Sequence, residues 1–384
     1  MNVERAHGDG PRRGGILIAG GGTAGHVLPG LAVAAALVER GVVADRSDVH
    51  LVGSRRGVEV ELVPGAGFGL TVLGGRGIQR RLTPANVGAL MGLLAGFLRA
   101  FLLMVRARPR VVLSLGGYAS IPCGLAAVVL RVPLVVAEQN AVPGAANRLL
   151  GRFARASAVS FVDTALPRPE LTGNPVRAAI RSAVGTRSEA RARIGVDDRP
   201  LLVAFGGSLG ARRINRAVAD FVEGWRGGPL AVRHVVGARG WAAGEMATAV
   251  PAGVGYTAVA YEHDMPTLLA AADLVVCRSG ATSVAELAVL GVPSVLVPLP
   301  GAPGDHQTAN ARHLAGSGGA VLLADADLDG SALEDLLGEI LSDPPRRDAM
   351  AEAARSMARP DAADRVVDLI LRHAAGRCDD VRDA

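Results

Sequence analysis

The sequence contains no lysine, so all 41 of its cationic side chains are arginines, against 36 carboxylates and a formal net charge of +5. Aromatic residues make up only 3% of it and the arginines are scattered. Base-stacking platforms are therefore scarce, and we expect no nucleic-acid partner. The cysteines, Cys123, Cys277 and Cys378, lie far apart without CxxC spacing, which argues against a disulfide framework and a zinc site. The basic charge suits a nucleotide or an acidic lipid.

The length and one repeated pattern predict two domains. The 384 residues exceed one ordinary domain. An apolar run and a glycine loop over 15–25 lead, after Pro29, into a helical pattern over 31–40. The same order of strand, glycine loop and helix recurs from 201, beyond an Asn-Pro linker at 173–177. The predicted fold class is α/β, with two Rossmann-like, doubly wound parallel-sheet domains facing each other across a cleft.

The first glycine loop predicts an anion-binding turn. Glycines let the backbone approach a ligand, and a helix N-terminus favours an anion. The spacing Gly20-x-Gly22-x-x-Gly25 also matches the dinucleotide fingerprint, which is weak by itself. Arg55 and Arg56 follow the next strand and would suit the 2′-phosphate of NADP, unless they form a solvated basic loop. An NADP-dependent oxidoreductase is therefore one hypothesis.

The apolar run over 87–105 is almost long enough to span a membrane. Arg99 interrupts it, and the flanking segments continue a βα alternation, so a buried or half-buried helix is the plainer interpretation. A third hypothesis is an interfacial patch that offers apolar side chains to lipid and arginines to lipid phosphates. The arginines of this patch are Arg76, Arg80, Arg81 and Arg99, and its apolar residues are Ile78, Leu82, Leu90, Leu94 and Phe97.

Polar residues follow several predicted strands, at the edge where ligands bind in open α/β sheets. Asn140 ends a polar triplet after the strand at 133–137, and Glu286 falls about one turn into a helix that starts near 281. The two DxD matches within 325–329 could suggest a metal site. We interpret them as a helix-capping acidic stretch far from the glycine loops.

Seven motifs in one order resemble the MurG family of peptidoglycan glycosyltransferases, which have the GT-B fold. The resemblance covers roughly residues 14–372 and is far more specific than any single glycine loop. The motifs are Gly20-Gly21-Gly22-Thr23-Ala24-Gly25-His26, Gly116-Gly117-Tyr118, Glu138-Gln139-Asn140, Gly173-Asn174-Pro175-Val176-Arg177, Gly206-Gly207-Ser208-Leu209-Gly210-Ala211, Arg278-Ser279-Gly280-Ala281 with Glu286, and Asp305-His306-Gln307 with Asn310.

The resemblance implies inverting transfer of N-acetylglucosamine from UDP-N-acetylglucosamine to the C4 hydroxyl of the muramoyl sugar of lipid I, which yields lipid II. It implies no metal and no cofactor. The expected partners are UDP-N-acetylglucosamine, lipid I, an anionic membrane surface and other cell-wall enzymes. The expected location is peripheral, on the cytoplasmic face of the cell membrane.

The stretch 1–13 is polar and lacks the apolar core of a signal peptide, which predicts a disordered tail. The resemblance implies the domains that follow, first an acceptor and membrane-side domain over 14–174. A UDP-sugar domain over 175–345 and C-terminal helices over 346–374 follow, of which the last packs back on the first domain. A loose tail covers 375–384.

His26 is the best candidate for the general base, because a neighbouring helix N-terminus disfavours a cationic imidazole. The alternative is a loop histidine that bonds the backbone or an acceptor phosphate. By resemblance, Ser208 and Arg177 hold the donor diphosphate, and Glu286 holds the ribose. The other expected substrate-binding residues are Thr23, Ala24, Gly25, Tyr118, Asn140, Tyr261, Glu262, Ala281, Thr282, His306 and Gln307.

Three positions depart from the family pattern. Ala137 stands where a histidine is common, Ala24 where glycine is usual, and Leu209 where glutamine is common. None of them removes a group that the reaction needs, but they leave the donor-sugar contacts open.

Overall fold

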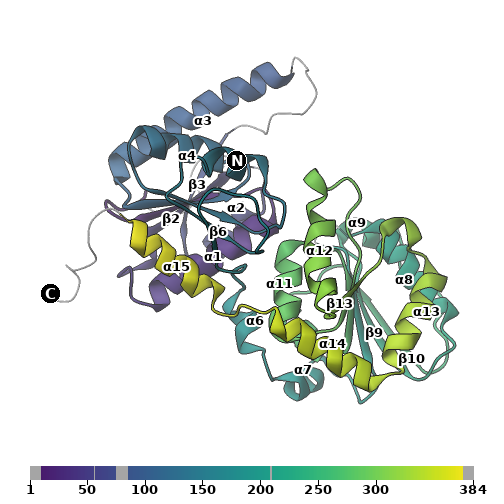
Figure 1. The fold of residues 1–384 in the computed structure, drawn as a ribbon. Helices are drawn as coiled ribbons and strands as arrows, with labels where there is room; N and C mark the ends of the chain where they lie inside the picture. Colours follow the sequence, from purple (N-terminus) through teal and green to yellow (C-terminus); the bar gives the residue numbers. More distant parts are fainter. Residues whose placement is uncertain (1–9, 56, 75–84, 208–209, 375–384) are drawn as a thin grey trace. The chain divides into compact units, whose positions relative to one another are not determined.

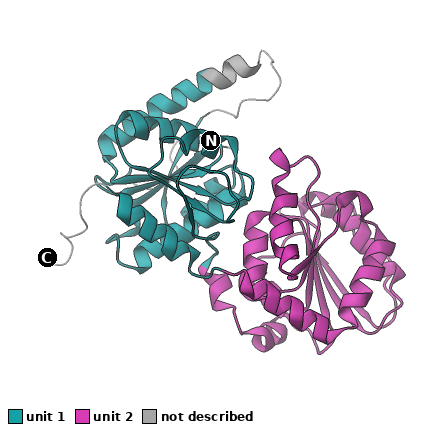
Figure 2. Cartoon of the chain, viewed as in Figure 1, with its two compact units in different colours: residues 1–177, 359–384 teal, residues 178–358 magenta. Residues whose placement is uncertain are grey.

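The computed structural model describes residues 10–55, 57–74, 85–207 and 210–374 (Figure 1). Side chains within the helix that begins at Ala85 are described from Met91 on. The chain divides into two compact units (Figure 2). Unit 1 comprises Met1–Arg177 with Arg359–Ala384, and unit 2 comprises Ala178–Ala358. The chain thus leaves unit 1 at the end of the expected linker and returns to it before its last helix.

Unit 1 contains a seven-stranded sheet in the order β3-β2-β1-β4-β5-β6-β7, and every neighbouring pair is parallel. Because β1 lies between β2 and β4, the strand order reverses there, which is where open α/β sheets place their ligands. The strands are β1 Ile16–Gly20, β2 Val49–Ser54, β3 Gly69–Leu73, β4 Val111–Gly116, β5 Leu134–Glu138, β6 Ala156–Val159 and β7 Pro169–Leu171.

Helices cover both faces of this sheet. Alternate residues of β1 point to opposite faces, so Ile16 and Ile18 join one core and Leu17 and Ala19 join the other. The first core includes side chains of α1, α2 and α15, and the second includes side chains of α3 and α4. The helices are α1 Ala24–Glu39, α2 Glu59–Gly65, α3 Ala85–Ala107, α4 Ser120–Val129, α5 Ala145–Leu150 and α15 Ala362–His373.

Helix α1 begins earlier than the sequence predicts. The expected start after Pro29 is wrong, because α1 starts at Ala24 and Pro29 lies inside it. Thr23, in an extended conformation with φ −138° and ψ 154°, is the N-cap instead. Proline usually marks a first helical turn, which explains the error. As a result, His26 lies in the first turn of α1 and not in a free loop.

The last helix returns to unit 1 and packs beside α1 (Figure 1). Val366 and Ile370 of α15 are fully buried in the first core. The Arg40 guanidinium, next to the end of α1, lies 2.6 Å from the Asp368 carboxylate. Helix α14, Pro344–Ser356, belongs to unit 2, so the two C-terminal helices are divided between the units.

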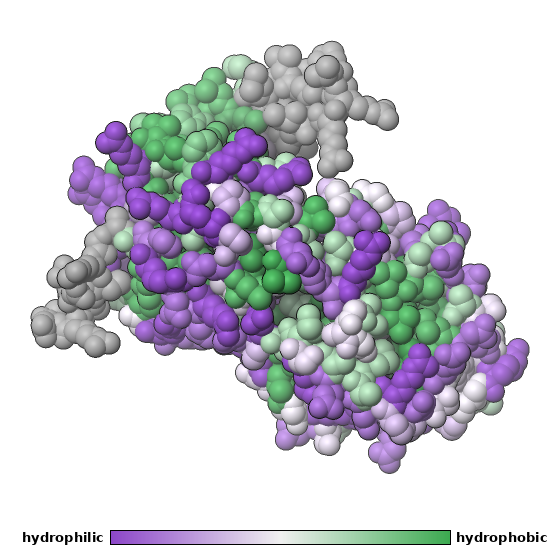
Figure 3. Space-filling model, in the orientation of Figure 1, coloured by the Kyte–Doolittle hydropathy of each residue, from purple (hydrophilic) through white to green (hydrophobic). Residues whose placement is uncertain are grey.

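Helix α3 buries one face and exposes the other. Ala100 and Met104 are buried in the second core. The opposite face leaves a stripe of apolar side chains exposed by 45–61%, and hydrophobic surface gathers over α3 in Figure 3. The stripe consists of Met91, Leu94, Leu98, Leu102 and Val105. Within the described part of the chain, no helix combines the length and the apolar character that a membrane span needs.

Unit 2 repeats the plan with a six-stranded sheet in the order β10-β9-β8-β11-β12-β13, again parallel throughout. Here β8 lies between β9 and β11, as β1 lies between β2 and β4. The strands are β8 Leu201–Phe205, β9 Leu230–Val235, β10 Val254–Val259, β11 Leu274–Cys277, β12 Ser294–Leu296 and β13 Ala320–Leu322. The other helices are α6 Ala178–Ser182, α7 Arg187–Ile194, α8 Arg212–Gly224, α9 Ala238–Ala242, α10 Met265–Ala271, α11 Ala281–Leu290, α12 His306–Gly316 and α13 Gly330–Leu341.

Candidate active site

The first glycine turn joins β1 to α1 at the carboxyl edge of the unit 1 sheet. Gly22 has a φ of +93°, a conformation that favours glycine. Its backbone N–H points to the Glu59 carboxylate, 3.1 and 3.0 Å from the two oxygens. Ala24 and Gly25 are the first two residues of α1, and the N–H groups of a first helical turn have no partner within their helix. The His26 N–H donates to the Thr23 carbonyl at 3.1 Å, so the donors that can face a ligand are the N–H groups of Thr23, Ala24 and Gly25.

His26 is tied to the N-cap of its own helix. Its Nδ1 lies 3.2 Å from the Thr23 hydroxyl oxygen, and the imidazole is half-buried. Its Nε2 lies near the end of β4, where a Cβ added to Gly116 would approach it to 3.4 Å. The Asn147 amide nitrogen would be 3.3 Å from the same Cβ. The imidazole and the Asn147 amide thus converge on the end of β4.

Glu138 orders the loop that carries Asn140. The carboxylate, 3% exposed at the end of β5, accepts hydrogen bonds from the Asn140 N–H at 3.0 Å and the Asn140 amide at 3.2 Å. It also accepts from the Gly144 N–H at 3.0 Å and the Asn147 amide at 2.9 Å. Ser114 donates to the amide oxygen of Asn147. The sequence analysis did not identify Asn147. Its one indication in the sequence is that it is a polar residue in the short segment after the strand that ends at Glu138.

Tyr118 follows Gly117, whose added Cβ would lie 2.5 Å from the Gly21 carbonyl oxygen of the first glycine turn. The Tyr118 hydroxyl donates to the Gly74 carbonyl at 3.0 Å and so joins the turn after β4 to the end of β3. Partial burial raises the pKa of this phenol. Arg177 is half-buried at the last position of unit 1.

Two sets of predicted residues cannot be placed. Ser208, together with Leu209, lies outside the described residues, and so do the patch residues Arg76, Ile78, Arg80, Arg81 and Leu82. The described glycines on either side of Ser208 and Leu209 lie in close contact with their neighbours. Gly206 has no room for a Cβ, which would lie 2.3 Å from the Ala211 nitrogen. Gly210 has a φ of +82°, and a Cβ there would lie 2.3 Å from the Val236 carbonyl. Helix α8 then begins at Arg212.

The donor-side residues gather where α11 and α12 begin. Ala281 and Thr282 open α11, and Glu286 is 6% exposed one turn further on. The Thr282 hydroxyl oxygen is buried without a hydrogen-bond partner in the described part of the chain. An unsatisfied buried hydroxyl of this kind is uncommon in native proteins and fits a ligand contact.

Ser279 and Asn310 join the two helix starts. The Ser279 hydroxyl donates to the Gln307 carbonyl at 2.8 Å, and the Asn310 amide donates to the Ser279 carbonyl at 3.2 Å. The Gln307 amide oxygen accepts from Leu299 N–H, and His306 Nδ1 lies 2.8 Å from the Pro303 carbonyl oxygen. His306 and Gln307 are thereby held next to Ala281 and Thr282.

Tyr261 and Glu262 follow β10 at the same edge of the unit 2 sheet. The Tyr261 ring is 57% exposed and packs edge-on against His263, with centroids 4.9 Å apart. Glu262 accepts from the Asp264 N–H at 3.1 Å. The exposed ring is free to pack against a planar group.

The acidic stretch 325–329 lies close to the donor side, which corrects the expectation that it is far from the glycine loops. Asp325 pairs with Arg278 at 2.6 Å, just before α11, and lies 3.8 Å from Arg213 of α8. Asp329 caps α13 by accepting from Ala332 N–H at 2.9 Å, which confirms the capping interpretation. Among the described residues, no group of three or more His, Cys, Asp or Glu side chains could hold a metal ion.

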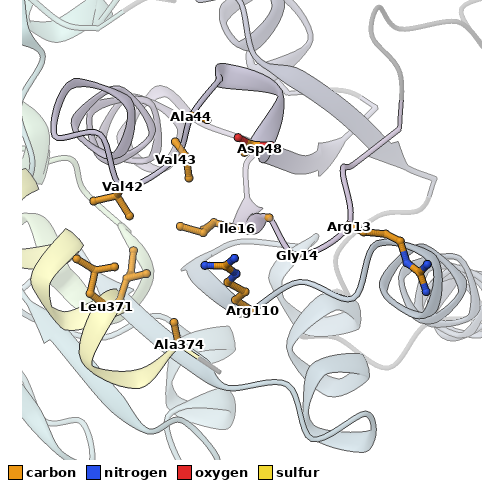
Figure 4. Close-up of a pocket in the computed structure, with 12 residues that line it drawn as sticks. Arg13, Gly14, Ile16, Val42, Val43, Ala44, Asp48, Arg110, Leu371 and Ala374 are labelled. Atoms are coloured by element: carbon orange, nitrogen blue, oxygen red, sulfur yellow. The ribbon is translucent and has the colours of Figure 1, made fainter. Parts of the chain in front are cut away.

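A separate cavity lies in unit 1 where β1 begins, at the opposite edge of the sheet (Figure 4). Arg13, Arg110 and Asp48 contribute polar groups, and apolar residues such as Val43 and Leu371 complete the lining. No residue of the predicted site lines it, so we assign it no part in the reaction.

Comparison with known proteins places this arrangement in a family. Family models match residues 16–159 as the "Glycosyltransferase family 28 N-terminal domain" and residues 201–366 as the "Glycosyltransferase family 28 C-terminal domain". A crystal structure of MurG from Acinetobacter baumannii has a TM-score of 0.74 at 30% identity, covering 94% of this chain and all of that one. Fold and site therefore define a two-domain glycosyltransferase of the GT-B class, which confirms the expected fold class.

Two curated relatives support the same family assignment. A protein of Desulforudis audaxviator is 40% identical over 370 residues, 92% of this chain and 97% of its own length. One of Alkalilimnicola ehrlichii is 41% identical over 364 residues, 94% of this chain and 99% of its own. Both are named UDP-N-acetylglucosamine–N-acetylmuramyl-(pentapeptide) pyrophosphoryl-undecaprenol N-acetylglucosamine transferase. The chain belongs to glycosyltransferase family 28, and within it to the MurG transferases, as the motifs indicated.

Proposed function

We propose that this protein transfers N-acetylglucosamine from UDP-N-acetylglucosamine to the C4 hydroxyl of the muramoyl sugar of lipid I, with inversion, and so forms lipid II. The observation that carries the proposal is the 40% identity, over nearly the whole chain, to relatives named for transfer to an N-acetylmuramyl pyrophosphoryl-undecaprenol acceptor. The chain retains polar groups at the carboxyl edges of both sheets, as a two-substrate transfer requires.

The donor binds, in this proposal, at the start of α11. The helix N-terminus and the unpartnered Thr282 hydroxyl suit phosphate oxygens. The Glu286 carboxylate, one turn further on, suits the two ribose hydroxyls. As the glycosidic bond breaks, the UDP oxygen keeps the electron pair, and N–H groups of the Ser208 turn together with Arg177 stabilise its charge. The residues thereby supply that stabilisation without a metal or cofactor.

The acceptor lies, in this proposal, against the first glycine turn, with His26 as the base. When the imidazole proton is on Nδ1 and is donated to the Thr23 hydroxyl, Nε2 is the ring nitrogen that carries the lone pair and can accept a proton. Nε2 then takes the proton of the acceptor hydroxyl while its oxygen attacks the anomeric carbon from the face opposite UDP. In the alternative role, the same imidazole hydrogen-bonds an acceptor phosphate.

The test is transfer of labelled N-acetylglucosamine to a lipid I analogue by wild type, His26→Ala and Glu286→Ala. We expect His26→Ala to lower kcat by about 10²- to 10⁴-fold with unchanged UDP binding, and Glu286→Ala to raise the KM for the donor. Glu339→Gln, on the exposed surface of α13, is the control and should behave as wild type. A folded wild type without transfer would refute the proposal, and a raised acceptor KM with normal kcat in His26→Ala would favour the phosphate role.

The oxidoreductase alternative is not supported. Its fingerprint, Gly20-x-Gly22-x-x-Gly25, is present, but the relatives and the family models are those of glycosyltransferases. The Gly22 N–H, which a dinucleotide phosphate would need, is also engaged by Glu59. Arg55 is exposed, and Arg56 lies outside the described residues.

We also propose that the protein is peripheral to the cytoplasmic face of the cell membrane, where lipid I is embedded, and meets other cell-wall enzymes there. The exposed apolar stripe of α3 supports the membrane contact. Arginines within 75–84 and Arg99 of α3, itself exposed, would contact lipid phosphates. An anionic lipid surface is therefore the expected partner of this face.

A further inference from the structure

Glu59, the first residue of α2, places a buried carboxylate beneath the first glycine turn, and no step of the proposed reaction uses it. The residue is 1% exposed. Its Oε1 accepts hydrogen bonds from the Ser54 N–H at 2.6 Å and the Ser54 hydroxyl at 2.8 Å. Both of its oxygens also accept from the Gly22 N–H. Among the described residues its partners are these neutral donors, whose hydrogen bonds to the charged carboxylate offset part of the cost of burying it.

Three glycines leave the space that this side chain fills. A Cβ at Gly21 would lie 2.2 Å from a Glu59 oxygen, one at Gly53 would lie 2.5 Å from its Cγ, and one at Gly57 would lie 1.9 Å from the other oxygen. Real Cβ contacts are never this short, so any other residue would displace the carboxylate. The turn after β1, the end of β2 and the segment before α2 are therefore shaped around Glu59.

The carboxylate fixes the direction of the peptide that precedes the site. An ionised carboxylate only accepts hydrogen bonds, and every partner of Glu59 donates. The Gly22 N–H is thereby directed inward, in a backbone conformation with φ +93°. The next residue, Thr23, is the N-cap of α1 and the hydrogen-bond partner of His26. A change at Glu59 is thus transmitted directly to the start of α1.

We infer that Glu59 is a positioning residue for the acceptor side of the reaction. It turns the Gly22 peptide inward and so sets the N–H groups from Thr23 onward, together with the His26 imidazole, toward the acceptor. It contacts no substrate itself. The inference rests on the proposed function, which assigns the acceptor to this turn.

The test compares Glu59→Gln with Glu61→Gln. Glu61 is exposed on the same helix, so the control makes the same charge change on the same element. In Glu59→Gln an amide NH₂ replaces one oxygen and opposes the Gly22 or Ser54 donors. With a lipid I analogue we expect the acceptor KM to rise and the acceptor kcat/KM to fall about 100-fold, while the donor KM stays unchanged. Hydrogen exchange of the amides over 16–30 should accelerate, and Glu61→Gln should match wild type in both measurements.

Two results would overturn the inference. One is an acceptor kcat/KM in Glu59→Gln close to that of wild type. The other is a fall in kcat that only matches the measured loss of folded protein, with both KM values unchanged, since a smaller folded fraction then explains the whole effect. If Glu59→Gln does not fold, Ser54→Ala replaces it in the test, because this variant removes one donor and keeps the carboxylate. An unchanged acceptor KM in Ser54→Ala would also overturn the inference. If the wild type shows no transfer, the proposed function is refuted instead. Hydrogen exchange of Glu59→Gln then tests the positioning contact by itself, and unchanged exchange over 16–30 refutes that contact.

Discussion

Buried carboxylates determine the loops at the carboxyl edge of the unit 1 sheet. Glu138 accepts from the backbone of Asn140 and Gly144 and from the Asn147 amide, and Glu59 accepts from Gly22 and Ser54. Hydrogen bonds to a charged acceptor are stronger than those between neutral groups. At the scale of single residues, these two side chains hold the loops in place from the core side. Other groups of the same loops contact the ligand in the proposed reaction.

A buried histidine lies on the strand that pairs with the first strand of each unit, β1 in unit 1 and β8 in unit 2. His50 of β2 is hydrogen-bonded through Nε2 to the Thr71 hydroxyl of β3, at 2.8 Å. His234 of β9 is hydrogen-bonded through Nδ1 to the Tyr256 hydroxyl of β10, at 2.9 Å. Burial lowers the pKa of each imidazole from 6.5 to about 4. Both are therefore neutral in the folded protein near neutral pH.

The free energy of unfolding should decrease on acidification because of these two histidines. In the unfolded chain an imidazole takes up a proton below pH 6.5, whereas in the folded protein it does so only near pH 4. The unfolded state thus binds more protons in this window, and stability is lost as the pH falls from 6.5 to 4. Each histidine contributes about 3 kcal/mol over that range. Urea unfolding at pH 7 and at pH 4.5 measures this difference in the free energy of unfolding.

The histidine prediction has a direct control. In His50→Gln the unfolding transition of unit 1 should lose this part of its pH dependence, whatever its stability at pH 7. An identical pH dependence in His50→Gln and wild type would contradict the assignment to His50.

At the scale of elements, α1 and α3 differ in what their free surfaces can do. Helix α1 packs against the sheet and α15, and its start, with Thr23 and His26, lies at the carboxyl edge of the sheet, where a ligand can reach it. Helix α3 packs through Ala100 and Met104 and leaves the stripe from Met91 to Val105 without cover in the described structure. A contiguous apolar stripe of this kind indicates an interaction surface.

Membrane binding through α3 is testable by changing that stripe. Leu98→Gln with Leu102→Gln should lower binding to anionic vesicles at least about tenfold, because each leucine loses a favourable transfer of about 1.5–3 kcal/mol. Sedimentation with phosphatidylglycerol-containing vesicles measures it. Val250→Gln, an exposed apolar position in unit 2, is the control. Unchanged sedimentation of the double variant would show that α3 does not contact lipid.

At the scale of the whole molecule, each unit has its own sheet and its own core. Leu37 and Ile370 are buried in a core of unit 1, and Phe221 and Leu337 are buried in the core of unit 2. The proposed donor contacts at Thr282 and Glu286 belong entirely to unit 2. A donor ligand should therefore stabilise unit 2 in particular.

UDP should protect unit 2 selectively. A ligand at 100 times its Kd stabilises the folded state by about 2.7 kcal/mol, so exchange of amides within 178–358 should slow most around α11. Hydrogen exchange with and without UDP measures this, and NADPH is the control nucleotide and should give no protection. Protection around residues 20–26 by NADPH would revive the oxidoreductase hypothesis.

The parts of the fold that were predicted correctly depend on local patterns. The strand and glycine loop of each repeated unit, and the helix that starts near 281, match the structure closely. The strands β3, β7 and β13 were missed, because a threonine interrupts the apolar run of β3, β7 is Pro-Glu-Leu, and β13 has only three residues. The start of α1 was placed too late, because Pro29 outweighed Thr23 as a signal.

The sequence by itself determined the class of this protein, because seven ordered motifs and two repeated glycine turns are local features that residue order records directly. Only the tertiary structure decided which groups support the site. Gly22 and Glu59 are 37 residues apart in the chain, and Arg278 and Asp325 are 47 apart. Nothing in the local sequence pairs such residues. Their contacts exist because parallel strands bring the loops at their carboxyl ends to one edge of a sheet, where buried charges must find hydrogen-bond donors.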